Sequence, residues 1–249
     1  MVGRSHWLLL RESLVSLHRT WHSIPELTVV SDGSWKKDEF LKTFDFWPGS
    51  IRVLDTDEIF EPLNNTGQQD LVKLAKSHPL GLKLATIIVC AQRKPVFFVD
   101  SDILWFSDPA DILKSYNSPG GPVTTVENGS SYNESLVQRF CPEGIPAPGV
   151  NTGCVYLQGN LCGESLLRDL LTAALEDPKE NFNEQTIIAI AVQKGGRTFP
   201  ARLCLVDFAD AMTFKRRKPW REGFHSRHYV NWMRHQFYRD ALTLRRTAP

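Results

Sequence analysis

The sequence of 249 residues contains no long hydrophobic run. A membrane-spanning helix needs about 20 consecutive apolar residues, so no transmembrane segment is expected. The run Leu8–Leu10 is too short for the core of a signal peptide, and charged residues follow it directly. We therefore expect a cytoplasmic protein.

Cysteine is also scarce: the chain has five, an odd number, and no two are spaced as Cys-x-x-Cys. This pattern argues against a disulfide framework and favours reduced thiols in a protein core. Hydrophobic residues make up 42% of the chain and charged residues 23%, which is typical of a globular protein. A chain of this length can bury a sizeable core without disulfides or structural metals.

Net charge is small, at +1, but it is unevenly distributed. Residues 215–246 contain ten Lys or Arg against Glu222 and Asp240, a balance of +8, so the rest of the chain carries −7. A basic segment after an acidic body predicts contact with a polyanion, either a substrate phosphate or, as a peripheral contact, an anionic membrane. A solvated basic helix would give the same pattern. We expect no nucleic-acid partner.

Short apolar runs alternate with helical patterns along the chain, which predicts an α/β fold with a mixed, mostly parallel sheet flanked by helices. We find no repeat or linker, so a single domain over residues 1–249 is expected. Residues 127–148 are polar and rich in Pro and Gly, which predicts a long functional loop. The predicted strands cover residues 27–30, 51–54, 96–99, 123–126, 149–157 and 203–208.

The central feature is Asp100-Ser101-Asp102, which follows the apolar run 96–99. That run is too short for a helix and consists of β-branched and aromatic residues, so it predicts a buried strand. Two carboxylates at the end of such a strand are costly to bury unless they are paired. Hard divalent cations prefer carboxylate oxygens, so Asp100 and Asp102 predict a Mg²⁺ or Mn²⁺ site, with a solvated strand end as the alternative.

Short motifs follow one another in a recognisable order. They are Ser31-Asp32-Gly33-Ser34, Lys83-Leu84, Phe98-Val99-Asp100-Ser101-Asp102-Ile103, Val150-Asn151-Thr152-Gly153, Asn183-Glu184-Gln185-Thr186 and His228-Tyr229-Val230. Together they resemble the GT-A-type glycosyltransferases of the nucleotide-diphospho-sugar transferase superfamily, and most of all the family 8-like enzymes. The resemblance implies a Rossmann-like GT-A domain and metal-dependent transfer of a sugar from a nucleotide-diphosphate sugar, UDP-linked, to a hydroxyl acceptor.

The resemblance also implies a role for each matching position. Asp100, Asp102 and His228 are expected to hold Mn²⁺ or Mg²⁺ on the diphosphate. The residues expected to act at the transferred sugar are Asn151, Glu184 and Gln185. The acceptor is expected to be a saccharide, a lipid or another hydroxyl compound. The residues expected to bind the nucleotide sugar are Asp32, Ser34, Lys83, Asp100, Ser101 and Thr152.

These residue types suit the chemistry of sugar transfer. A nucleoside diphosphate leaves more easily when a metal bridging its phosphates neutralises its charge, and Lys83, Arg227 and Arg234 could add to this effect. An inverting enzyme needs a carboxylate base, for which Asp207 and Asp210 are further candidates. A retaining enzyme can use a weaker group such as the amide of Gln185, and the resemblance slightly favours retention.

Some residues also have simpler interpretations. Asp32 could make only a local turn, Glu184 could be an acid favoured by the first turn of a helix, and Lys83 could be a solvated helix lysine. His225 could replace His228 as a ligand. Because only Met1–Arg4 precede the first helix, the first strand of the GT-A sheet is expected to be short or missing.

Two other functions remain open from the sequence. The chain could be a non-catalytic or degenerate module that binds a sugar or nucleotide without the first strand. It could also be a metal-dependent phosphatase of the haloacid-dehalogenase type. Those enzymes need a threonine two places after the second aspartate, where this chain has Leu104, so the phosphatase is the weaker alternative.

Overall fold

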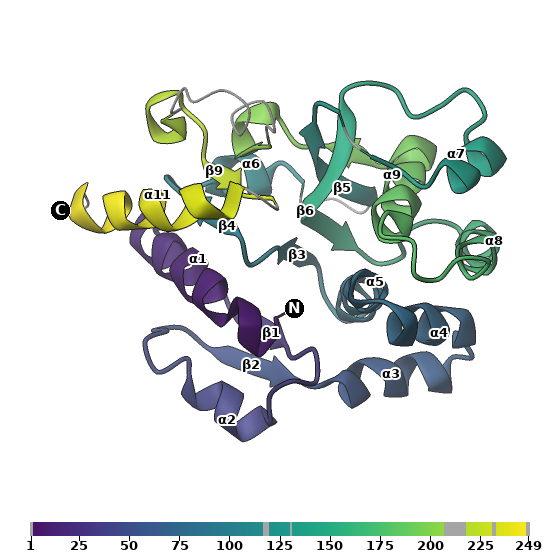
Figure 1. Cartoon of the computed structure of the whole chain (residues 1–249), viewed down its shortest axis with the longest axis horizontal. Coiled ribbons are helices and arrows are strands. Elements are labelled where there is room, and N and C mark those ends of the chain that lie inside the picture. The colour runs from purple at the N-terminus through teal and green to yellow at the C-terminus, as the bar shows by residue number, and fades with distance from the viewer. Residues whose placement is uncertain (1, 117–119, 130, 207–217, 231–232, 248–249) are drawn as a thin grey trace. The chain divides into compact units, whose positions relative to one another are not determined.

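The computed structural model describes residues 2–116, 120–129, 131–206, 218–230 and 233–247 (Figure 1). The chain forms two compact units, each assembled from stretches that lie far apart in the sequence. Unit 1 comprises Met1–Val53, Val99–Asn117 and Phe199–Pro249, and unit 2 comprises Leu54–Phe98 and Ser118–Thr198. A single domain over residues 1–249 stays a prediction.

Unit 1 is built around helices α1 and α11 and two small sheets. Strands β1 and β2 form one sheet, and the other has the order β4-β9-β8, with β4 antiparallel and β8 parallel to β9. Its helices are α1 (Trp7–Thr20), α2 (Lys37–Lys42), α6 (Ala110–Lys114) and α11 (Arg234–Thr247). Its strands are β1 (Leu27–Val30), β2 (Ile51–Leu54), β4 (Ile103–Trp105), β8 (Cys204–Leu205) and β9 (Ser226–His228). Short 3-10 helices occupy Arg4–His6, Ala201–Leu203 and Pro219–Arg221.

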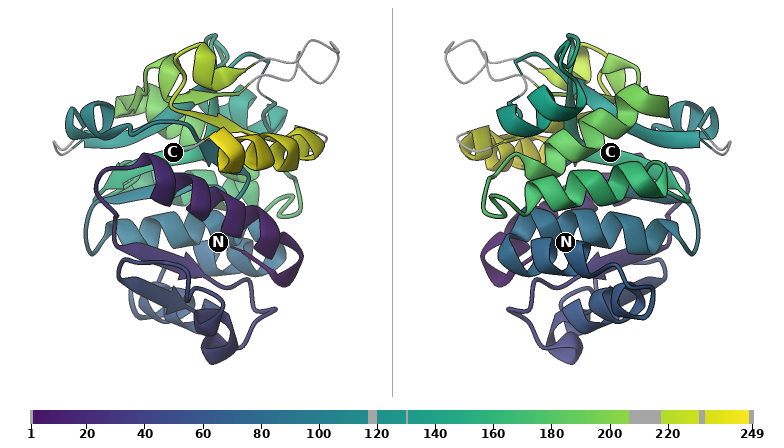
Figure 2. Two further views of the ribbon diagram at one scale, coloured as in Figure 1. Left: turned by 90° about the vertical axis from the view of Figure 1, so that its left-hand side faces the viewer. Right: turned by 90° about the vertical axis from the view of Figure 1, so that its right-hand side faces the viewer.

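Helix α11 lies beside α1 in unit 1, as the left view in Figure 2 shows. The apolar cluster beneath it joins Leu9 of α1, Leu104 of β4 and Phe237 of α11, all of which are buried. Arg245 of α11 forms an ion pair with Glu12 of α1 at the exposed edge of this contact. The C-terminal helix is therefore part of the packed core of unit 1.

Unit 2 contains a four-stranded sheet with the order β3-β6-β5-β7. Strand β5 runs antiparallel to β6 and parallel to β7. Its strands are β3 (Val96–Val99), β5 (Gly120–Glu127), β6 (Gly149–Gln158) and β7 (Arg197–Thr198). Its helices are α3 (Thr56–Asn65), α4 (Gln69–Ser77), α5 (Pro79–Ala91), α7 (Glu134–Phe140), α8 (Glu164–Ala174) and α9 (Asn183–Gly195).

The helices of unit 2 pack closely on this sheet and on one another. Helix α9 packs against β5 and β6, and α5 packs against α9, β6 and α4. A Cβ atom on Gly81 would lie 2.3 Å from the carbonyl oxygen of Leu74, so only glycine allows α5 to approach α4 this closely. Nearly all of α5 is buried, including Lys83.

The predicted mixed α/β class is confirmed, with parallel and antiparallel pairings in both the β4-β9-β8 sheet and the sheet of unit 2. The predicted short first strand corresponds to Val2, which makes a single parallel bridge to Ser31. Helix α3 was not predicted, although the residues of its capping box are present in the sequence: Asp55 accepts from the Glu58 amide, and the Glu58 carboxylate accepts from the Asp55 amide.

The prediction of a continuous loop over residues 127–148 was wrong, because α7 lies within it. The side chain of Asn133 accepts hydrogen bonds from the amides of Ser135 and Leu136 and so begins this helix. Among the described residues, no helix combines the length and apolar character needed to cross a bilayer.

Candidate functional site

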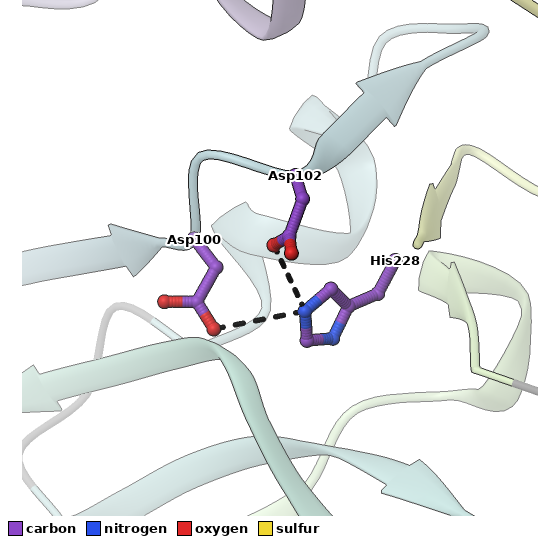
Figure 3. Close-up of side chains that lie close together, drawn as sticks. All are labelled: Asp100, Asp102 and His228. Carbon is purple, nitrogen blue, oxygen red and sulfur yellow. Dashed lines mark hydrogen bonds and ion pairs between the residues drawn. The ribbon is translucent and has the colours of Figure 1, made fainter. Parts of the chain in front are cut away.

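Asp100, Asp102 and His228 come together in unit 1, and Figure 3 shows both carboxylates directed at one imidazole nitrogen. The Nε2 atom of His228 lies 3.1 Å from Oδ1 of Asp102 and 3.7 Å from Oδ2 of Asp100. Asp102 and His228 are buried, whereas the Asp100 side chain is 26% exposed. The three predicted metal ligands therefore form one cluster that is open on the Asp100 side.

Local backbone structure brings these three residues together. Asp100 follows β3, the chain bends through Ser101, and Asp102 directly precedes β4. Strand β4 pairs antiparallel with β9, with Ile103 opposite His228. The next residue, Tyr229, donates its backbone N–H to the carbonyl oxygen of Asp102 at 2.9 Å. Register between β4 and β9 thus sets His228 beside the two aspartates.

Arg234, in the first turn of α11, holds the other oxygen of Asp102. Its Nε and Nη2 atoms donate to Oδ2 at 3.1 and 3.0 Å. Burial alone would raise the pKa of Asp102, but the charges and hydrogen bonds of His228 and Arg234 lower it to about 2. Burial alone would lower the pKa of His228, but Asp102 and Asp100 raise it to about 9. The cluster therefore favours a positive charge at the Nε2 position.

This donor set fits a divalent cation. Two carboxylates and an imidazole suit Mn²⁺, and carboxylates also suit Mg²⁺. Ligands about 2.1 Å from an octahedral ion lie roughly 3 Å apart when they are neighbours. The separations of 3.1 and 3.7 Å between Nε2 and the two carboxylate oxygens are close to that spacing. A metal bound here would take the place of the proton on Nε2.

A second buried charge network lies within unit 2. The Nζ atom of Lys83 lies 3.5 Å from Oε1 of Glu184, and these side chains are only 5% and 2% exposed. Thr152 donates its hydroxyl to Oε2 of Glu184 at 3.0 Å, and Lys83 donates to the Thr152 hydroxyl at 3.3 Å. The alternative that Lys83 is a solvated lysine is wrong, because α5 buries it among these partners.

Asn151 has a buried partner that was not predicted from the sequence. Its Nδ2 atom donates to Oε2 of Glu127 at 2.9 Å, and its Oδ1 atom accepts from the backbone N–H of Gly153 at 2.9 Å. Glu127 is 4% exposed and ends β5, opposite Gly149. A carboxylate at the end of an apolar strand is the same signal that identified Asp100, so it could have pointed to Glu127.

Gln185 is half-buried, and its Nε2 atom donates to the carbonyl oxygen of Ser131 at 2.9 Å. Its amide therefore ties α9 to the segment before α7. Asn183 is the first residue of α9, and its side chain bonds Asn133 and the carbonyl oxygen of Asp177.

Asp32 and Ser34 lie in unit 1 and are exposed. Asp32 accepts from the Ser34 amide at 2.9 Å, which is the local turn foreseen as an alternative, and the Ser34 hydroxyl accepts from the Arg4 amide. His225 is not part of the cluster of Asp100, Asp102 and His228, and its Nδ1 atom lies 2.9 Å from the Ser107 hydroxyl. Asp207 and Asp210 lie outside the described residues.

Most of the tryptophan and arginine side chains described below pack against aromatic rings, and one arginine contacts the candidate site. Trp105 is fully buried and packs edge-on to Trp21, so it belongs to the core. Trp35 stacks on Phe40. Arg227 is buried with its guanidinium 5.0 Å from the centroid of the Tyr229 ring, whereas Arg234 bonds Asp102 of the candidate metal site.

Comparison with known proteins identifies the family of this chain. The profile of the nucleotide-diphospho-sugar transferase family matches residues 85–238, which include all three candidate metal ligands. Comparison with curated protein sequences gives no match.

Solved structures share the fold at low sequence identity. Galactosyltransferase LgtC in complex with donor and acceptor sugar analogs matches with a TM-score of 0.58 and 12% identity, over 97% of this chain and 94% of that chain. An active-site mutant of LgtC gives 0.58 and 13% over the same shares. The apo structure of the bifunctional glycosyltransferase WbbM gives 0.57 and 13%, over 92% of this chain and 45% of that one. The chain therefore belongs to the nucleotide-diphospho-sugar transferase family and is a glycosyltransferase with a GT-A fold.

Proposed function

We propose that this glycosyltransferase uses Mn²⁺ or Mg²⁺, held by Asp100, Asp102 and His228, to move a sugar from a UDP-linked donor to a saccharide hydroxyl. The observation that carries the proposal is the convergence of these three ligand atoms within 4.8 Å of one another. A saccharide acceptor is favoured because LgtC, which has a similar fold, is described in complex with donor and acceptor sugar analogs.

A divalent metal at this site would supply charge neutralisation for the departing nucleoside diphosphate. The residues of the chain prepare the site for that role. Arg234 fixes the Asp102 carboxylate through Oδ2 and leaves Oδ1 directed at His228. Asp100 remains partly exposed and can meet an incoming ligand.

The partners of Glu184 favour retention of configuration. An inverting transferase needs a free carboxylate to take the acceptor proton. Glu184 is engaged by both Lys83 and Thr152 in a buried network, so it is poorly placed to take that proton. We propose that Gln185 and Asn151 act at the sugar as amides, and that Asp32, Ser34, Lys83, Ser101 and Thr152 serve the nucleotide sugar.

Contact of the C-terminal segment with an anionic membrane stays a prediction. Much of the positive charge on α11 is already paired within unit 1: Arg234 with Asp102, Arg239 with Asp240, and Arg245 with Glu12. These pairs reduce the charge that the helix could offer to a lipid surface.

Isothermal titration calorimetry of UDP with and without Mn²⁺ tests the proposed function. We expect Mn²⁺-dependent UDP binding and slow hydrolysis of a UDP-sugar by the wild type, and loss of both in Asp100→Ala and Asp102→Asn. Asp108→Ala is a matched control, since Asp108 also belongs to unit 1 but bonds His22 and the Ala110 amide instead. A UDP affinity that does not change when Mn²⁺ is removed or when either site variant is used would contradict the proposal.

A further inference from the structure

We propose that Tyr229 and Asp240 are positioning residues for the metal site, and that the hydrogen bond between them sets β9 against α11. The inference rests on the proposed function, because it concerns how this chain prepares Asp102 and His228 for a metal. Neither Tyr229 nor Asp240 is among the ligands.

The bond itself is buried. The hydroxyl of Tyr229 donates to Oδ2 of Asp240 at 2.9 Å, and both side chains are 0% exposed. A buried carboxylate is costly unless it is paired, and the Nε atom of Arg239 lies 3.6 Å from Oδ1 of Asp240. The chemistry proposed for the site uses neither residue, so a buried charge at this position calls for another role.

The two elements joined by this bond also hold Asp102 between them. Tyr229 extends β9 directly after His228, and its backbone N–H donates to the carbonyl oxygen of Asp102 at 2.9 Å. Helix α11 carries Arg234, which donates two hydrogen bonds to the Asp102 carboxylate. If β9 and α11 separated, the Asp102 backbone would follow one element and its carboxylate the other.

Packing gives the Tyr229 hydroxyl a fixed direction. The ring lies edge-on to Phe237 of α11, with centroids 5.4 Å apart, and belongs to the apolar cluster that includes Leu104 and Met233. The Arg227 guanidinium lies 5.0 Å from the ring centroid. Tyr229→Phe therefore removes the hydroxyl and keeps the packing that orients the ring.

Mn²⁺ titration followed by electron paramagnetic resonance tests the proposal on the full chain. Partners that orient metal ligands typically change metal affinity by about 10–100-fold when removed, so we expect Tyr229→Phe to weaken Mn²⁺ binding by about tenfold or more and to alter the bound Mn²⁺ line shape. Asp240→Asn retains an acceptor for the hydroxyl and should lose less affinity. Tyr156→Phe, which removes a buried hydroxyl of unit 2 that lies 3.4 Å from Gln158, should bind Mn²⁺ as the wild type does.

The outcomes separate this inference from the proposed function. If the wild type binds no Mn²⁺, the proposed function fails. If the wild type binds Mn²⁺ and folded Tyr229→Phe binds it with the same affinity and line shape, only the positioning role is overturned. A lower thermal unfolding midpoint without any change in Mn²⁺ binding would show a purely structural bond and would also overturn the role.

Discussion

The cluster around Asp102 in unit 1 and the network around Lys83 in unit 2 both bury charge, but they balance it differently. In unit 2, Lys83 and Glu184 neutralise each other in a site that solvent barely reaches. In unit 1, two aspartates face one imidazole, and Arg234 bonds Oδ2 of Asp102 while His228 contacts Oδ1. The first arrangement is balanced by a lysine, whereas the second is balanced only while His228 carries a proton, which a cation could replace.

This difference indicates that the cluster of unit 1 is suited to bind a ligand, whereas the network of unit 2 is suited to hold the interior in one arrangement. The aspartate charges that raise the pKa of His228 to about 9 would also favour a bound cation, and the partly exposed Asp100 side chain would give the cation access. A closed ion pair holds its side chains in one arrangement and has little to gain from a cation. Perturbing the two regions should therefore give different results.

The largest expected effect is on the stability of unit 2. Lys83→Met leaves Glu184 buried without its cation, and breaking a buried pair in this way costs about 3–5 kcal/mol in unfolding free energy. Replacing both members, Lys83→Met with Glu184→Met, should recover most of this loss, because well-packed apolar replacements of buried pairs are often neutral. Urea denaturation measures both, and Mn²⁺ affinity should stay within twofold of the wild type. A Lys83→Met variant that is as stable as the wild type would contradict the claim that Lys83 and Glu184 neutralise each other.

The next effect is the pH dependence of Mn²⁺ affinity in unit 1. Since His228 has its pKa raised to about 9, a metal must displace its proton at neutral pH. Affinity should rise about tenfold for each pH unit between pH 6 and 8 and level off near pH 9, because one proton is released per ion bound. Calorimetry in buffers of different ionisation enthalpy gives the proton count. An affinity independent of pH over this range would remove His228 from the ligands.

The same pKa shifts set the pH dependence of stability in metal-free protein. Because the pKa of His228 is raised, its contribution is fully present below the unfolded value near 6.5 and is lost as pH rises through about 9. Because the pKa of Asp102 is lowered, its contribution is present above about 3.8 and is lost as pH falls towards 2. The thermal unfolding midpoint of chelator-treated protein should fall at both ends of this pH range. In His228→Gln the fall at alkaline pH should disappear.

A smaller effect is expected at Asn151. Glu127→Ala removes the acceptor that fixes the Asn151 amide, so we expect transfer to slow by about tenfold, the cost of roughly one hydrogen bond to a charged group. Glu127→Gln keeps an acceptor oxygen and serves as the matched control. Mn²⁺ affinity should not change in either variant, and steady-state kinetics with a UDP-sugar would show the loss. Equal activity in all three proteins would exclude this role for Glu127.

The smallest effect is expected at Asp32. Asp32→Ala removes the hydrogen bond from the Ser34 amide, which is exposed and contributes about 1 kcal/mol or less. A direct role of Asp32 in nucleotide binding requires a fall in UDP affinity that is larger than the loss of this one hydrogen bond explains. An unchanged UDP affinity would leave Asp32 as a turn residue alone.

The sequence predicts the parts of this protein that short-range patterns encode. The strand that precedes Asp100 and the helices α5, α8 and α9 are visible in local residue patterns, and the order of the motifs is read directly from the sequence. The convergence of Asp102 and His228, which lie 126 positions apart, was expected from the resemblance and not from any local pattern.

Other features depend on contacts that no local pattern specifies. The Tyr229–Asp240 bond and the hydrogen bonds from Arg234 to Asp102 depend on how α11 packs against α1 and β4, so composition indicated only a basic tail. The partners of Lys83 were hidden because a lysine in a helix reads as solvated until the burial of α5 is known. The helix α7 was missed because proline and glycine around it suggested a continuous loop.

The central claim is that Asp100, Asp102 and His228 share one cation. Anomalous diffraction from crystals grown with Mn²⁺ and UDP tests it most directly. The account predicts a Mn²⁺ peak in contact with all three side chains and with the UDP phosphates. Crystals that contain bound UDP but no Mn²⁺ at these residues, or Mn²⁺ held by other residues, would contradict it.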